Sequence, residues 1–201
     1  MRRIAFFDFD GTITKTDSFL IFLLKNKGNN IIFLFKCLKL LPTLILWKLG
    51  YYLNGFAKEQ VFKFFFKDFP WPAFEQLCLN FGETEVPKLI RKNALQTILW
   101  HKAQGDRVII VTASIEYYLQ AFVREYEIEV IGTLLEVREN KLTGNFCTLN
   151  CYGPEKVNRI KSLIKLQEYD EIYCYGDSKG DKEMLALANF SFYKSFNKRL
   201  A

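Results

Sequence analysis

The chain has 201 residues, half of them apolar, and its 28 Lys and Arg outnumber its 22 Asp and Glu, which gives a net charge of +6. This length fits one domain, or a core with one inserted subdomain, and the apolar content excludes wholesale disorder. The five cysteines are odd in number and have no CxxC spacing, which argues against a disulfide framework and a zinc site. The apolar run near Met1 is too short for a secretory signal, so we expect the catalytic part to be cytoplasmic.

Short apolar runs that end in polar residues occur three times along the chain. The first, Ile4 to Phe7, leads into Asp8, and similar runs at 107–111 and 171–175 also lead into polar clusters. Such runs are typical of buried parallel strands, and ligands bind outside the carboxyl ends of these strands. Helical spacing predicts helices at 87–104, 115–127, 154–167 and 181–188, and turn signals predict an antiparallel hairpin at 134–148. We therefore expect an α/β fold, with a Rossmann-like parallel sheet covered by helices on both faces.

Residues 14–86 differ in character from the rest of the chain. From Ser18 to Lys58 there are six lysines and no acidic residue, so this segment is a basic, apolar insert. Its apolar spacing predicts helices near 18–26, 30–49 and 56–68. The sequence Pro70-Trp71-Pro72 that follows must end a helix.

Asp8 and Asp10 follow the first predicted strand two residues apart, so their side chains can leave the chain on the same side. Two close carboxylates repel each other unless a cation or a shared proton relieves them, and Mg²⁺ prefers such oxygen ligands. The amides of Gly11 and Thr12 can point at a bound anion, as loop amides do at phosphate sites. An Asp-x-Asp pair alone is more often a solvated turn, so the interpretation depends on its partners.

Further polar residues follow the other two predicted strands. Thr112 can donate a hydroxyl hydrogen bond to an oxyanion, although it can equally be a helix cap. Lys156 lies at the start of a helix, where a cation opposes the helix dipole, although it can also be an ordinary surface lysine. Asp177 and Asp181 add two carboxylates to the same sheet edge. Four acids, a hydroxyl and a lysine together make a complete phosphoryl-transfer site.

In this order the four clusters resemble the motifs of the haloacid dehalogenase superfamily of aspartate-nucleophile phosphatases, and the resemblance covers the whole chain. The four motifs are matched by residues 8–12, by Thr112, by Lys156 and by residues 176–181. The resemblance implies a catalytic core of residues 1–13 and 87–201. It also implies that residues 14–86 form a helical cap inserted after the first motif, as in the phosphoserine phosphatase-like branch, subfamily IB.

The resemblance also implies how the reaction proceeds. Asp8 attacks phosphorus and forms an aspartyl-phosphate, while Asp10 protonates the leaving alcohol and then activates the hydrolytic water. The acid at position 10 argues against carbon–halogen chemistry, because the dehalogenases lack it. Mg²⁺ is the implied cofactor, with Asp8, Asp177, Asp181 and the main-chain carbonyl of Asp10 as ligands, and with Thr112 and Lys156 offsetting the phosphoryl charge. The implied substrate-binding residues are Gly11, Thr12, Asp17, Ala113 and Ser114.

The predicted helix within 31–49 bears on the choice of substrate. The unfavourable free energy of inserting its lysines into a bilayer offsets the favourable free energy of inserting its apolar residues, so hydropathy does not decide whether it spans a membrane. Lys36, Lys39 and Thr43 lie on one helical face and leave a broad apolar face of Phe33, Leu34, Leu38, Leu41 and Ile45. This apolar face either packs on neighbouring helices of the cap or inserts into an anionic bilayer surface.

The cap is similar to that of the C-type phosphatidylglycerophosphate phosphatases. Two short stretches, Asp17-Ser18-Phe19 and residues 153–157, share in this similarity. That similarity implies a lipid phosphomonoester as substrate, at the inner face of the cytoplasmic membrane. A soluble phosphoserine or small-metabolite phosphatase is the alternative, weakened because Asp17 stands where that group has a glutamate. A non-catalytic lipid-binding protein is a further alternative, which the intact acids oppose. Nucleic acid is not expected as a partner, because the lysines alternate with Leu and Ile rather than with stacking aromatics.

Overall fold

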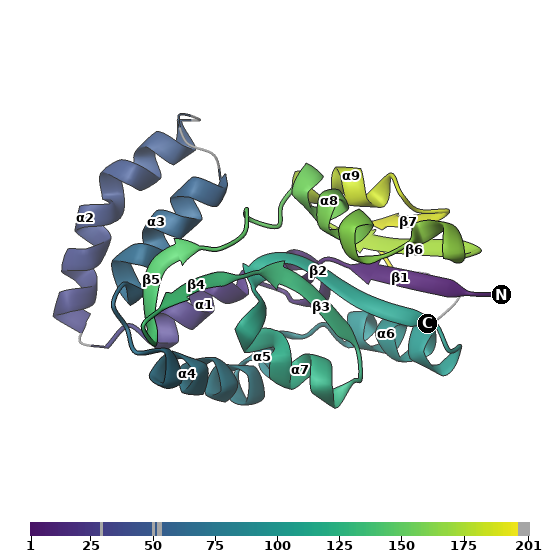
Figure 1. Ribbon diagram of the computed structural model, residues 1–201, viewed down its shortest axis with the longest axis horizontal. Coiled ribbons are helices and arrows are strands. Elements are labelled where there is room, and N and C mark those ends of the chain that lie inside the picture. Colours follow the sequence, from purple (N-terminus) through teal and green to yellow (C-terminus); the bar gives the residue numbers. More distant parts are fainter. Residues whose placement is uncertain (29, 50, 52–53, 197–201) are drawn as a thin grey trace.

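The protein is described here from a computed structural model, which covers residues 1–28, 30–49, 51 and 54–196, without the side chains of residues 32, 36, 44, 47 and 54. A five-stranded sheet in the order β3-β2-β1-β6-β7 forms its centre, and each neighbouring pair of strands is parallel (Figure 1). Its strands are β1 (Arg3–Phe7), β2 (Arg107–Ile115), β3 (Glu129–Thr133), β6 (Glu171–Gly176) and β7 (Phe190–Tyr193). The predicted α/β fold with a parallel sheet is confirmed.

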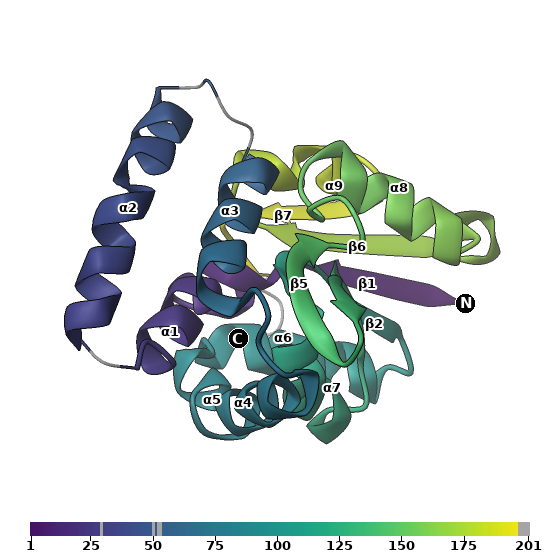
Figure 2. The same ribbon diagram turned by 60° about the vertical axis from the view of Figure 1, so that its left-hand side comes forward.

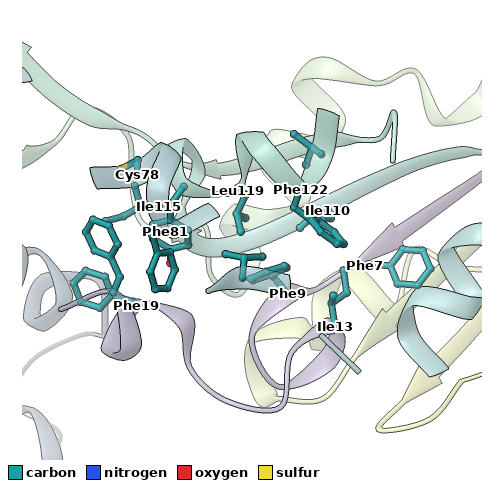
Figure 3. Packing of buried hydrophobic residues seen from close by; sticks show 14 of the residues in the cluster. Phe7, Phe9, Ile13, Phe19, Cys78, Phe81, Ile110, Ile115, Leu119 and Phe122 are labelled. Carbon is teal, nitrogen blue, oxygen red and sulfur yellow. The ribbon is translucent and has the colours of Figure 1, made fainter. Parts of the chain in front are cut away.

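Side chains that alternate along the strands divide the core between the two faces of this sheet. Phe7 and Ile110 belong to a large cluster on one face, part of which Figure 3 shows, whereas Phe6 and Ile109 belong to a smaller cluster on the other. The helices that cover the sheet are α5 (Val86–Leu89), α6 (Lys92–Ala103), α7 (Gln120–Glu125), α8 (Pro154–Leu163) and α9 (Lys182–Leu185). Helices α8 and α9 lie on the side of the sheet opposite to α6 and α7 (Figure 1).

Several predicted helices are shorter than expected. The helix expected at 87–104 is interrupted, because Ile90 and Arg91 are extended and the Arg91 amide donates to the Ile13 carbonyl at 2.8 Å. The helix expected at 115–127 begins late, because β2 continues to Ile115 and is followed by a short 3₁₀ turn, Glu116–Leu119. The helix expected at 154–167 is followed at its end by a 3₁₀ turn, Leu166–Glu168. The helix expected at 181–188 is preceded by another, Lys179–Asp181.

The segment between β1 and α5 is helical. Its elements are α1 (Ser18–Lys25), α2 (Asn30–Lys48), α3 (Asn54–Phe66) and α4 (Trp71–Thr84). The three helices expected here are confirmed, whereas α4 was not predicted. Pro72 lies in the first turn of α4, where its missing N–H removes no helical hydrogen bond, so the Pro70-Trp71-Pro72 sequence begins a helix as well as following one.

The predicted hairpin is also confirmed, as the antiparallel pair β4 (Leu135–Arg138) and β5 (Lys141–Phe146). It anchors α3, because the Phe146 amide donates to Glu59 Oε1 at 2.7 Å and the rings of Phe62 and Phe146 are 5.7 Å apart. Gly144 allows this close approach, since a Cβ at this position would lie 2.9 Å from the Lys63 Cα. The hairpin therefore fixes α3 relative to the carboxyl ends of the strands.

Helix α2 stands at the outer end of the molecule, next to α3 (Figures 1 and 2). Phe33, Cys37 and Leu40 face the interior, whereas Leu34 and Leu38 are more than half exposed. Phe33 was expected on the same face as Leu34 and Leu38, so that assignment was wrong, and the side chain of Lys36 lies outside the described residues. Among the helices that the structure describes, none combines the length and the apolar character needed to cross a bilayer.

Candidate active site

Three carboxylates converge where β1 and β6 end. Oxygen atoms of Asp8, Asp177 and Asp181 all lie within 4.8 Å of one another, and Asp8 and Asp181 are almost fully buried. Asp8 follows β1 directly, and Asp177 follows the neighbouring strand β6. Because both strands are parallel, their carboxyl ends bring the two side chains to the same sheet edge, as the sequence predicted.

Lys156, in the first turn of α8, lies among these carboxylates. Its Nζ donates to Asp8 Oδ1 at 2.5 Å and to Asp181 Oδ1 at 2.6 Å, and the residue is 1% exposed. The alternative of an ordinary surface lysine is therefore wrong. A cation is tolerated at this helix start because two carboxylates outweigh the unfavourable helix dipole.

The charges of this cluster do not balance. Three carboxylates face one ammonium group, so when all are ionised two negative charges remain in a largely buried space. An all-oxygen donor set with this surplus fits a hard divalent cation, and Mg²⁺ binds such sets through one or two carboxylates plus substrate oxygens. Asp8, Asp177 and Asp181 would hold the ion.

Asp181 is oriented by its own loop. Its Oδ2 accepts hydrogen bonds from the Ser178 amide at 2.9 Å and the Ser178 hydroxyl at 2.8 Å, which forms a capping box. Burial alone would raise the pKa of Asp181, but Lys156 and Ser178 outweigh it, so the pKa is lowered. Burial would likewise lower the pKa of Lys156, and its two carboxylate partners raise it instead. Asp181 and Lys156 are thus held as an ion pair.

Asp8 differs from Asp181 in its electrostatics. Burial raises the pKa of Asp8 to about 7, although Lys156 opposes the shift. Asp181 and Asp10 add to the rise through like-charge repulsion. A second cation beside the carboxylate would therefore favour its ionised form, in which it can act as a nucleophile.

Gly11 and Thr12 occupy the tight loop after Asp8. Gly11 has φ of +85°, and a Cβ at this position would collide with the Asp177 carboxylate, so any other residue would be strained here. The Thr12 hydroxyl donates to Asp177 Oδ1 at 3.1 Å. These residues line a cavity of about 370 Å³ together with Asp177 and Arg91, rather than the larger cavity described below. The loop therefore positions Asp177.

The carboxylate of Asp10 has different partners. Its Oδ1 accepts from the Ser18 amide at 2.8 Å, and its Oδ2 is hydrogen-bonded to the Ser114 hydroxyl. Ser18 Oγ in turn lies 2.9 Å from the Tyr118 hydroxyl. Burial raises the pKa of Asp10, and nearby Asp17 adds to the shift. Two neighbouring acids, Asp8 and Asp10, are thus held in different surroundings, which is how acid and nucleophile roles are separated.

Ser114 and Thr112 were both assigned to the substrate or its phosphoryl group. Ser114 is fully buried and contacts Asp10, so it positions that acid. Thr112 lies inside β2 rather than at a helix start, which contradicts the helix-cap alternative. Its Oγ1 accepts from the Ser114 amide at 3.0 Å, and the residue lines the larger cavity.

A cavity of about 540 Å³ connects this cluster with the helical segment. Its polar end contains Asp8, Asp10, Thr112, Ala113, Lys156 and Asp181. Its other end is lined mainly by Phe19, Leu23, Phe33, Leu40, Val61 and Phe65 from α1, α2 and α3. A ligand that fills it would place a polar group at the carboxylates and an apolar part between the helices.

Asp17 and Lys58 lie between these two ends. Asp17 lines the cavity, and its Oδ1 also accepts from the Leu20 amide at 2.9 Å, which caps α1. Lys58 was missed by sequence reasoning. Its Nζ donates to the Ala113 carbonyl at 2.8 Å, and burial lowers its pKa against the pull of Asp10 and Asp17. The sequence carries no signal for Lys58, because only the structure shows which side of α3 faces the cavity.

Comparison with known proteins identifies the family. The family model described as haloacid dehalogenase-like hydrolase matches residues 5–186. The chain belongs to the haloacid dehalogenase-like hydrolases. Protein CicA of Caulobacter vibrioides is 32% identical to this chain over 192 residues, which cover 94% of this chain and 85% of that protein.

Two solved structures show the same fold as this haloacid dehalogenase-like hydrolase. A protein of unknown function from Bordetella pertussis Tohama I has a TM-score of 0.82 at 21% identity, with 96% of this chain and 90% of that chain covered. A phosphoserine phosphatase, solved as a phospho-aspartyl intermediate analogue, has a TM-score of 0.65 at 15% identity, with 96% and 86% covered. At these identities the likeness concerns the fold.

Proposed function

We propose that this hydrolase is a Mg²⁺-dependent phosphomonoesterase that works through an aspartyl-phosphate on Asp8. One observation carries the proposal, namely the buried contact of Lys156 with Asp8 and Asp181 beside Asp177. A fold shared with a phosphoserine phosphatase that was captured as a phospho-aspartyl analogue supports it. When bound, Mg²⁺ would supply positive charge that offsets the carboxylates and the phosphoryl oxygens.

The chain's own residues account for both halves of the reaction. In the first, a carboxylate oxygen of Asp8 forms a bond to phosphorus, the bond from phosphorus to the ester oxygen breaks, and Asp10 gives its proton to the departing alkoxide. In the second, Asp10 takes a proton from water, the water oxygen bonds to phosphorus, and the bond to Asp8 breaks. Lys156 and Thr112 stabilise the phosphoryl oxygens, and Gly11 and Thr12 hold their loop in place.

For the substrate we propose a phosphomonoester with a lipid leaving group, such as a phospholipid head-group phosphate. The apolar end of the cavity supports this, because Phe19, Leu23 and Phe65 offer no group that would pair a polar leaving group. The proposed division is a catalytic core of residues 1–13 and 87–201 and a cap of residues 14–86, whose helices line the apolar end. The proposed location is the cytoplasm, peripheral to the inner face of the cytoplasmic membrane.

A soluble phosphoserine or small-metabolite phosphatase is the second candidate. Lys58 favours it, because a cation beside Asp10 and Asp17 can pair the carboxylate of a small substrate. Turnover of phosphatidylglycerophosphate, phosphoserine and small phosphoalcohols, measured side by side, separates the candidates. Preference for phosphoserine would contradict the lipid substrate.

The reaction itself is tested with Asp8→Asn and p-nitrophenyl phosphate. We expect turnover to fall by on the order of 10⁴-fold or more, because the nucleophile is lost. The matched control is Asp68→Asn, the same chemical change at an exposed residue outside the cavity, which should keep full turnover. Undiminished turnover in Asp8→Asn would contradict the mechanism and leave the non-catalytic lipid-binding alternative ahead.

A further inference from the structure

The outer side of α2 exposes a row of large apolar side chains. Each of these residues is between 50% and 62% exposed, and they are Leu34, Phe35, Leu38, Leu41 and Ile45. Leu34, Leu38, Leu41 and Ile45 follow one another at spacings of four, three and four residues, which places them along one stripe of the helix. Phe35 lies beside Leu34 at the edge of this stripe, and the five residues are here called the outer face of α2. Monomeric soluble proteins rarely expose a continuous apolar stripe of this kind unless it binds something.

The position of α2 makes the outer face accessible. Helix α2 is the outermost element at its end of the molecule in both views, and α1 and α3 lie on its inner side (Figures 1 and 2). Phe33, Cys37 and Leu40, on the inner side, line the large cavity. One helix thus separates the apolar end of the cavity from the outer face.

The charges around the outer face are of one sign. The 3.6-residue repeat places Lys39 on one flank of the stripe and Lys48 on the other, and both residues are exposed. From residue 18 to residue 58 the chain has no acidic residue that could offset them. An apolar stripe with a cationic side chain on each flank is complementary to an anionic bilayer surface.

We propose that the outer face of α2 docks on an anionic phospholipid surface, with the apolar stripe in the interface and the two lysines at the head groups. This proposal deepens the proposed function. The docking itself does not depend on that function, but the statement that the docked enzyme receives a lipid substrate rests on it. Pairing with a second copy of the chain is less favourable, because apposed outer faces would bring like charges together without a counter-charge. Docking would bring the cavity, which lies directly behind α2, to the lipid.

The test is co-sedimentation of the full chain with phosphatidylcholine vesicles, with and without phosphatidylglycerol. We expect binding to the anionic vesicles, and a partition coefficient lower by on the order of tenfold in Leu38→Gln and in Leu41→Gln. Lys39→Gln and Lys48→Gln should each lower it by about fivefold at low salt, and moderate salt should shrink that difference. The matched control is Leu163→Gln, which removes a leucine that is 67% exposed on α8 and should bind like the parent chain.

These vesicles contain no phosphomonoester, so the result does not depend on catalysis. Equal partitioning of Leu38→Gln and the parent chain would overturn the proposal. It would also be overturned if the parent chain turned over p-nitrophenyl phosphate but bound no anionic vesicle, and that result would leave the proposed function intact. Binding by an inactive chain would support docking and contradict the proposed function. Sedimentation without vesicles completes the test, since a dimer that Leu38→Gln dissociates would assign the face to a second copy. Thermal unfolding of each variant checks that the fold is retained.

Discussion

The two ends of the large cavity differ in polarity and in how tightly their side chains are paired. At the sheet edge, polar groups are buried and closely paired, and Lys156 alone holds two carboxylates within 2.6 Å. In the helical segment the cavity wall is apolar, and Leu38 and Leu41 on the far side of that wall remain exposed. A buried polar cluster fixes geometry because leaving any of its members unpaired is costly, whereas an apolar wall adapts to ligands of different shape. Under the proposed function, chemistry and choice of substrate would therefore belong to different parts of the molecule.

The sharpest test of the polar end uses two leaving groups. Asp10→Asn should lower turnover of an alkyl phosphate by about 10²–10⁴-fold, because no acid remains to protonate the alkoxide. p-Nitrophenolate is a stable anion and needs little protonation, so its release in the first half of the reaction should slow much less. Single-turnover rates with both esters separate the two effects. Equal slowing would mean that Asp10 is not the acid.

A pair of substitutions tests the contrast between buried and exposed positions within the helical segment. Phe62 is fully buried in α3 and contacts Phe66 and Phe74, so Phe62→Ala should lower the free energy of unfolding by about 3–5 kcal/mol. Leu38→Ala should change it by less than about 0.5 kcal/mol, because Leu38 is 55% exposed. Urea unfolding measures both. A large loss in Leu38→Ala would show that the outer face is covered in solution.

Metal binding should be visible in stability. Mg²⁺ at about 100 times its dissociation constant should raise the free energy of unfolding by about 2.7 kcal/mol, because it binds only the folded chain. The thermal midpoint with and without Mg²⁺ measures this without any turnover. In Asp177→Asn the increase should largely disappear, since one ligand of the carboxylate cluster is lost. A midpoint that Mg²⁺ leaves unchanged in the parent chain would contradict the metal assignment.

The smallest expected effect comes from His101, which lines neither of the two cavities. Its ring nitrogens lie 2.7 Å from Asp106 Oδ2 and 3.0 Å from the Tyr175 hydroxyl, and burial lowers its pKa below 6.5 against the pull of Asp106. The unfolded chain therefore binds a proton at a higher pH than the folded one, and stability from this residue is complete above pH 6.5 and declines as the pH falls below it. Between pH 7 and pH 5 the urea concentration at the unfolding midpoint should fall less in His101→Gln than in the parent chain. An equal fall in both chains would contradict the assignment of this pH dependence to His101.

The sequence predicted the polar end better than the apolar end. Asp8, Lys156, Asp177 and Asp181 could be placed together because each lies at the end of a strand or the start of a helix, and parallel strands bring such points to one edge. The contacts of Asp10 with Ser18 and Ser114 could not be predicted, because they depend on how α1 packs against β2. Long-range packing has no local signal in a single sequence.

The helical segment shows the same limit. The period of apolar residues indicated α2, but Phe33 was assigned to the wrong side, because the sequence does not say which part of a broad apolar face meets α3 and the cavity. Helix α4 was missed behind Pro70-Trp71-Pro72, where the prolines were taken only as a stop. β7, Phe190–Tyr193, was missed because its four residues are too short for a pattern.

The pairing of β1 also governs the order in which the parts can form during synthesis. Ile4 pairs with Arg107 on one side, and Arg3 pairs with Glu171 on the other. At translation rates of about 5–20 residues per second, the end of α3 is made roughly 5–20 s before β6. The apolar helices therefore leave the ribosome before the central strand has both of its neighbours. When α2 has been synthesised, Asp8 therefore still lacks the Lys156, Asp177 and Asp181 side chains that surround it in the folded protein.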